Sequence, residues 1–216
     1  MGELARAWID AVAALGGDPT SAAASGADAE RRYAHPARGY HGPAHILSVL
    51  ADAAALGAEV GLDAREQACV AAAACAHDVV YDGVAGQDER RSADWARAAL
   101  LAAGADPAAD RVAGLVLATA EHVAPPGDDA AAVLLDADLA ILAADPDRYR
   151  AYVDAVRGEY AHLSDAQWRT GRSAVLAALA ERPILYHTEA ARTRWDAAAR
   201  AALRAELTGL RESSRR

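Results

Sequence analysis

Residues 71–82, which read AAAACAHDVVYD, constrain the fold of this chain more than any other stretch. The run of small apolar residues predicts a buried helix. It ends in an adjacent pair, His77 and Asp78, where a turn begins before Gly83 and Gly86. Burying an imidazole and a carboxylate is costly unless a partner neutralises them. A divalent cation would do so, and since one pair cannot hold it alone, we expect further ligands elsewhere in the chain.

The rest of the chain favours helices over strands. It is rich in Ala, Leu and Arg, has no Phe, and its Val and Ile do not cluster in alternating runs. Glycines, prolines and capping residues divide it into expected helices at 4–15, 28–34, 46–56, 64–80, 88–103, 108–122, 129–143, 146–161, 164–180 and 189–210. The segment 18–27, with its Pro, Ser and Gly, is expected to be a turn-rich connection. No repeat or linker is visible, so we expect an all-α fold in a single domain over 1–216, with a core of about 33–182 and helical extensions at both ends.

Charge and residue usage exclude several function classes. The net charge of −9 argues against binding a nucleic-acid polymer, although a bound metal could still attract a small phosphorylated substrate. All 22 basic residues are Arg, which excludes lysine Schiff-base chemistry and a Walker-type phosphate loop. The two cysteines, Cys69 and Cys75, share one expected helix and suggest no disulfide. Without a signal sequence or a segment long enough to span a bilayer, we expect a cytoplasmic protein with no membrane partner; a homo-oligomer remains open.

A second acidic signal lies in the apolar segment 134–142, which contains Asp136 and Asp138. Residues two apart on a helix point about 200° apart, so only one is expected to reach a common centre. The i±3 and i±4 neighbours of Asp138 are Leu134, Leu135, Ile141 and Leu142. Those of Asp136 are Ala132, Val133, Leu139 and Ala140. We therefore expect Asp138 to face inward as a metal ligand and Asp136 to lie outside the ligand set, facing solvent or capping a neighbour.

A helical His, an adjacent His-Asp pair and a distant Asp occur here as His45, His77, Asp78 and Asp138. This order and context resembles the HD-domain metal-dependent phosphohydrolases. Further short motifs resemble a small bacterial branch of that superfamily: Tyr40-His41-x-x-x-His45-Ile46, His77 to Asp82, Asp88-Glu89-x-x-Ser92-Ala93, Leu135 to Leu139, Glu159 to His162, and Gly171-Arg172-x-x-Val175-Leu176. The resemblance covers roughly Tyr33 to the final helix. It implies an HD-type helical bundle and that the four named residues are the metal ligands, and it leaves the substrate open.

The residue types agree with this chemistry. Two imidazoles and two carboxylates suit Mn²⁺, Fe²⁺, Co²⁺, Ni²⁺, Zn²⁺ or Mg²⁺. Four ligands on a six-coordinate ion would leave one position for a water and one for a phosphoryl oxygen. The chain has no GxSxG elbow and no Cys beside a predicted base, which favours attack by water. We expect hydrolysis of a small-molecule phosphate ester, such as a nucleoside monophosphate, with Asp78 essential for metal affinity and turnover.

Several residues are candidates for supporting roles. Glu89 and Asp82 could act as general acid or base, although acids at a helix start also complement its dipole. His41 could line the entrance, and His122 could line the pocket, add a ligand or complement its helix dipole. Arginines could clamp a phosphate through forked hydrogen bonds, unless they are merely solvated; the candidates are Arg90, Arg91, Arg169 and Arg172. His35, His162 and His187 receive no role.

Two other functions compete with hydrolysis. Some HD proteins resemble this one but hold two irons and activate oxygen, and these need additional histidines between the His-Asp pair and the final Asp. Only His122 lies in that interval, and none occurs in 88–103. The other alternative is a non-catalytic module in which the metal only holds the helices together, although structural sites are normally closed by their ligands.

Overall fold

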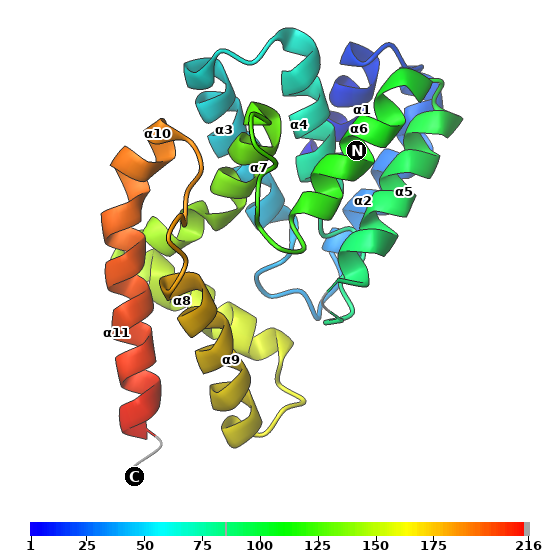
Figure 1. The fold of residues 1–216 in the computed structure, drawn as a ribbon. Coiled ribbons are helices and arrows are strands. Elements are labelled where there is room, and N and C mark those ends of the chain that lie inside the picture. Colours follow the sequence, from blue (N-terminus) through cyan, green and yellow to red (C-terminus); the bar gives the residue numbers. More distant parts are fainter. Residues whose placement is uncertain (85, 214–216) are drawn as a thin grey trace.

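The structure is a computed structural model, and it describes residues 1–84 and 86–213. Within these ranges the secondary structure is helical and contains no strand, so the predicted all-α fold is confirmed (Figure 1). The first seven helices are α1 (Glu3–Ala14), α2 (Pro19–Tyr33), α3 (Pro43–Val60), α4 (Ala64–Ala76), α5 (Asp88–Ala102), α6 (Asp106–Ala118) and α7 (Asp129–Asp138). The remaining elements are the 3₁₀ turn η1 (Leu139–Ala143), α8 (Pro146–Glu159), α9 (Asp165–Ala180), α10 (Glu189–Ala191), the π-helical turn η2 (Arg192–Asp196) and α11 (Ala197–Ser213).

The helix α2 corrects one expectation, because the segment 18–27 is helical rather than a turn-rich connection. Asp18 is the N-cap and accepts hydrogen bonds from the backbone N–H groups of Thr20 and Ser21, while Pro19 occupies the first turn. Gly26 lies where α2 crosses α1, and a Cβ there would be 3.0 Å from the carbonyl oxygen of Ala5. Pro19 and Ser21 thus belong to the first turn of α2, and Gly26 lets α2 pack closely on α1; these residues do not form a loop.

The helix α4 occupies the centre of the molecule, as predicted from its sequence. It packs against α1, α3, α5, α6 and α7. In Figure 1, α3, α4 and α7 lie between α1, α2, α5 and α6 on one side and α11 on the other. In this arrangement Ala72, Ala73, Ala74 and Ala76 are completely buried, and their small side chains let five helices approach one axis.

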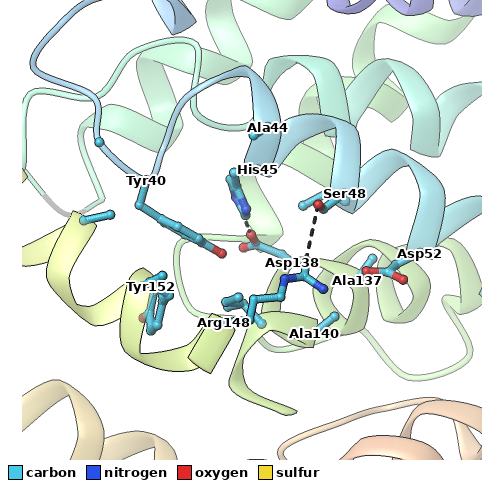
Figure 2. Close-up of a pocket in the computed structure, with 15 residues that line it drawn as sticks. Tyr40, Ala44, His45, Ser48, Asp52, Ala137, Asp138, Ala140, Arg148 and Tyr152 are labelled. Carbon is cyan, nitrogen blue, oxygen red and sulfur yellow. Dashed lines mark hydrogen bonds and ion pairs between the residues drawn. The ribbon is translucent and has the colours of Figure 1, made fainter. Parts of the chain in front are cut away.

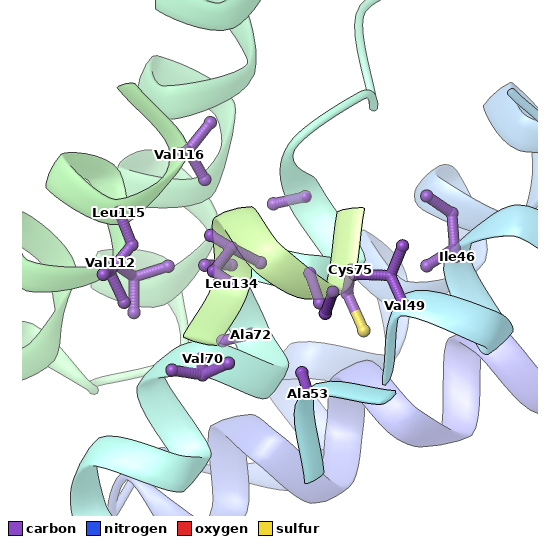
Figure 3. Packing of buried hydrophobic residues seen from close by; sticks show 14 of the residues in the cluster. Ile46, Val49, Ala53, Val70, Ala72, Cys75, Val112, Leu115, Val116 and Leu134 are labelled. Atoms are coloured by element: carbon purple, nitrogen blue, oxygen red, sulfur yellow. The ribbon is translucent and has the colours of Figure 1, made fainter. Parts of the chain in front are cut away.

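Branched side chains from neighbouring helices fill the space that the alanines leave. Figure 3 shows Cys75 of α4 among Ile46 and Val49 of α3 and Leu134 of α7. All four are at most 1% exposed. The thiol of Cys75 is a free core cysteine, and burial raises its pKa to about 12, so it acts here as a small apolar side chain.

Asp136 anchors the C-terminal elements to this core. It is completely buried, and its two carboxylate oxygens accept the backbone N–H groups of His187 at 2.6 Å and Thr188 at 2.7 Å. Thr188 is in turn the N-cap of α10. The expectation that Asp136 faces solvent is therefore wrong, and its carboxylate instead holds the backbone just before α10.

The helix α3 corrects the expectation that no segment is long enough to span a membrane. Within the described residues it is the one helix of sufficient length and apolarity, with 18 residues and a mean hydropathy of 1.2. It runs from Pro43 in its first turn to Gly61, whose left-handed backbone ends it. The finding is weak evidence for a membrane span, because core helices of globular proteins pass the same test. One face of α3 packs on α4 and α7.

Candidate metal centre

Three helix ends converge beside the core and bring His45, His77 and Asp138 together. His45 lies in the first turn of α3, His77 follows the last residue of α4, and Asp138 is the last residue of α7. One nitrogen or oxygen atom from each lies within 4.8 Å of the others, which is a grouping that could hold a metal ion. The backbone after α4 is fixed here, since Asp78 N–H donates to the hydroxyl of Tyr33 and Val80 N–H to that of Ser92.

Both imidazoles turn a buried nitrogen that lacks a hydrogen bond within the described residues toward this centre. The Nε2 atoms of His45 and His77 are buried and make no hydrogen bond. His45 Nε2 is 3.1 Å from Asp138 Oδ1, but the contact does not have the alignment of a hydrogen bond. His77 Nδ1 donates to the carbonyl oxygen of Ala74 at 2.9 Å, so that in the neutral ring Nε2 carries the lone pair that can bind a metal. Buried nitrogens are rarely left without a partner, so these two fit a metal ion as their ligand partner.

Asp78 borders the same centre. Its Oδ2 lies 3.3 Å from His77 Nε2 and 3.8 Å from His45 Nε2. It falls outside the tightest grouping, which comprises His45, His77 and Asp138. Two carboxylates and two imidazoles therefore meet here as the sequence predicted, with Asp78 as the neighbour of the triad.

The four groups strongly perturb one another's protonation. Burial lowers the pKa of His45. Burial acts the same way on His77, but the carboxylates of Asp78 and Asp138 outweigh it and raise the His77 pKa well above its usual value. Burial disfavours both carboxylates in their charged form, yet the facing histidines, His77 foremost, hold the pKa of Asp78 and of Asp138 well below the usual range. Without a cation the centre is thus a buried ion pair, and its carboxylates stay ionised at neutral pH.

His122 reaches the centre through the second oxygen of Asp138. Its Nε2 is 2.9 Å from Asp138 Oδ2. His122 has a φ of 50°, the only positive φ among the described residues other than glycine. Its carbonyl oxygen accepts from Arg182 at 2.8 Å and is 3.2 Å from the Nε2 of His187. A costly backbone conformation held from both sides suits a residue that orients a ligand carboxylate.

His41 is held by a carboxylate that the sequence reasoning did not assign. Glu159, at the end of α8, lies 2.6 Å from His41 Nδ1 and accepts the backbone N–H groups of Tyr40 and His41, each at 2.8 Å. Burial opposes ionisation of Glu159, but these contacts, led by the His41 side chain, lower its pKa. The His41 ring stacks on Tyr81 with centroids 4.2 Å apart. The only signal for Glu159 was its place in a short motif, 118 positions from His41.

The structure does not bring Asp82 and Glu89 to the centre. The exposed Asp82 pairs with Arg91 at 2.5 Å and lines a separate cavity. Glu89 accepts the backbone N–H of Gly86 at 2.6 Å, which is the helix-start role expected as its alternative.

Of the predicted phosphate clamps Arg90 and Arg172, the first lies away from the centre and the second is already bound to protein groups. Arg90 lies on α5, where its side chain is exposed and close to Gly86 in the preceding turn. Arg172 lines a cavity, but its guanidinium is occupied by a forked pair with Glu206 at 2.8 and 3.0 Å and by the hydroxyl of Tyr152 at 3.0 Å. Sequence periodicity could not reveal Glu206, because it lies on another helix.

Two cavities adjoin the centre and share Asp138, Tyr40 and Tyr152 in their walls. The larger, about 530 Å³, extends toward α9 and is lined by His41, His122 and the aromatic rings of Tyr81, Tyr160 and Trp168. The smaller, about 370 Å³, lies between α3 and α8 and includes His45, Ser48, Asp52 and Arg148 (Figure 2). The centre is therefore accessible to small molecules from two directions.

Comparisons with protein-family models, with curated proteins and with solved structures returned no match. Function is therefore inferred from the site itself.

Proposed function

We propose that this chain is an HD-type metal-dependent phosphohydrolase that acts on a small phosphate ester, such as a nucleoside monophosphate. The observation that carries the proposal is the pair of buried Nε2 atoms of His45 and His77, which face the carboxylates of Asp138 and Asp78 without a hydrogen bond within the described residues. Such a mixed nitrogen and oxygen set suits a first-row divalent cation. The HD-domain resemblance of the same four residues supports the same reading.

In this proposal His45, His77 and Asp138 hold the cation together with Asp78, while His122 orients Asp138. A bound cation would stabilise charge on a phosphoryl oxygen and lower the pKa of the attacking water. The two cavities beside Asp138 are large enough for a small molecule. A small molecule can enter this local site, whereas a nucleic-acid polymer would meet a chain with a net charge of −9.

His41 is better placed than Asp82 or Glu89 to exchange a proton with the leaving group. It lines the larger cavity together with Asp138. Glu159 engages its Nδ1, so Nε2 is the nitrogen left for a ligand. A carboxylate behind an imidazole fixes the orientation of the ring, so that its other nitrogen can exchange a proton with a bound ligand.

Metal-reconstituted protein tests the proposal directly. The protein is loaded in turn with Mn²⁺, Co²⁺, Ni²⁺, Zn²⁺, Mg²⁺ and Fe²⁺, and phosphate release is measured from a panel of nucleotides and sugar phosphates. We expect release with at least one metal, and loss of both metal and release in His77→Ala. The exposed His162 is not part of the centre, so His162→Ala is the matched control. Failure of every metal to support release overturns the hydrolase assignment.

One observation keeps iron-dependent oxygen chemistry as a second candidate. His122 brings a third imidazole to Asp138, at 2.9 Å. Oxygen consumption by the iron-loaded protein, together with no phosphate release, would favour this candidate.

A further inference from the structure

The smaller cavity is lined by Arg148, whose positive charge is not balanced by an ion pair within the described residues. Arg148 extends from α8 toward Ser48 on α3 (Figure 2), and its Nη2 is 3.4 Å from Ser48 Oγ. Ser48 lies one turn after His45 on α3, and both line this cavity with Asp138. Within the described residues, the guanidinium of Arg148 has no carboxylate oxygen within 4.0 Å. Its guanidinium donors are thus available beside the metal centre.

The other arginines near the centre are already engaged. Arg172 is bound to Glu206 and Tyr152, as described above. Arg182 also lines the larger cavity, and it donates to the carbonyl oxygens of His122 at 2.8 Å and Glu121 at 2.6 Å. Among the arginines that line these two cavities, Arg148 differs because its guanidinium makes one long hydrogen bond within the described residues, the 3.4 Å contact to Ser48.

We propose that Arg148 and Ser48 form an anion subsite that holds phosphoryl oxygens of the substrate on the α3–α8 side of the metal centre. The inference rests on the proposed function for its substrate, and it replaces Arg90 and Arg172 as the expected phosphate clamps. A guanidinium and a hydroxyl supply several donors, which suits a tetrahedral phosphoryl group. The organic part of the substrate then extends into the larger cavity, where Tyr81, Tyr160 and Trp168 offer aromatic surfaces.

Asp52 gives the proposal a second test of opposite sign. It lines the same cavity one turn beyond Ser48 and is half-buried, and burial raises its pKa while Arg148 and Arg194 oppose that change. An ionised Asp52 repels a phosphate bound nearby. Asp52→Asn removes this repulsion and leaves Arg148 in place, so it is expected to strengthen phosphate binding.

The experiment uses calorimetry to measure how tightly inorganic phosphate binds to the full-length Mn²⁺-loaded protein. We expect Arg148→Ala to weaken phosphate binding by about 10- to 100-fold, the range for a charge-assisted hydrogen bond. Arg148→Lys recovers part of the loss, because it restores charge without the fork. The control is Arg150→Ala on the same helix, since Arg150 is exposed and paired with Asp147. Mn²⁺ stoichiometry is measured for each variant, so that loss of the metal is not read as loss of the subsite.

The outcomes separate the subsite from the proposed reaction. Equal phosphate affinity in the wild type and Arg148→Ala overturns the subsite, and so does a wild type that binds no phosphate, even if esters are hydrolysed. Arg148-dependent phosphate binding without hydrolysis of any ester supports the subsite and overturns the proposed function. Where esters are hydrolysed, we expect Arg148→Ala to raise KM.

Discussion

Two clusters of buried charge differ in how completely they satisfy themselves. Between α9 and α11, Arg172 and Glu206 form a forked pair, and Tyr152 takes the remaining guanidinium direction. At the meeting of α3, α4 and α7, His45 and His77 leave their buried Nε2 atoms without a hydrogen bond. A satisfied cluster needs nothing further and serves packing, whereas an unsatisfied one is costly until a ligand binds. The comparison teaches that the first cluster is structural, whereas the second is a group that could hold a metal ion.

Breaking the satisfied cluster should have the largest effect on stability. Arg172→Ala leaves the carboxylate of Glu206 buried without its partner, and we expect a loss of about 3–5 kcal/mol in the free energy of unfolding. Arg150→Ala removes an exposed pair and should cost less than about 1 kcal/mol. Denaturant unfolding measures both, and a small loss for Arg172→Ala would contradict the structural role.

Filling the unsatisfied cluster should instead stabilise the protein. A cation that binds only the folded chain, at about 100 times its Kd, should add about 2.7 kcal/mol. Thermal unfolding with and without Mn²⁺ or Co²⁺ measures this, and His77→Ala should abolish the shift. An equal shift in His77→Ala would place the cation elsewhere.

A substitution at His122 tests the candidate metal centre indirectly, because His122 contacts Asp138 without belonging to the group of His45, His77 and Asp138. His122→Ala removes the contact to Asp138 Oδ2, and we expect metal affinity to fall about 10- to 100-fold. Alanine keeps a Cβ at this positive φ, so His122→Gly is the companion variant that tolerates this backbone. Unchanged metal affinity in both variants would reduce His122 to a pocket residue.

The pH dependence of metal binding should show the smallest but most specific effect. In the metal-free protein the pKa of His77 is raised, so this group stabilises the fold below its ordinary pKa, and that contribution is lost as pH rises through the raised value. A cation must displace this proton. We therefore expect affinity to rise about tenfold per pH unit up to the raised pKa of His77 and then to level off. Proton release measured in buffers of different ionisation enthalpy checks this, and pH-independent binding would contradict it.

The sequence predicted the cluster around His45, His77 and Asp138 far better than the pair of Arg172 and Glu206. His77 and Asp138 were recognisable from the apolar segments that contain them, and the apolar neighbours of Asp138 separated it from Asp136. His45 was named as a ligand through the resemblance to HD-domain proteins. Glu206 and Glu159 were not recognisable as partners, because each meets its partner across the fold, 34 and 118 positions away. Helical periodicity shows which face of a helix is buried, but it does not show what that face meets.

Local composition also misled in two places. Pro19 and Gly26 read as loop residues, although one starts α2 and the other lets α2 approach α1. Asp82 and Glu89 follow the His-Asp pair closely in sequence, yet the turn after α4 directs them to Arg91 and to the start of α5. Proximity along the chain was therefore a poor guide to proximity at the centre.

The most direct test of the central claim is anomalous diffraction from crystals of the Co²⁺- or Mn²⁺-loaded protein, recorded at the metal edge. The account predicts one strong peak within about 2.0–2.3 Å of the Nε2 atoms of His45 and His77, bordered by Asp138 and Asp78. Asp136 should keep its contacts to His187 and Thr188. A peak bound to other residues, or none at these nitrogens under saturating metal, would contradict the account.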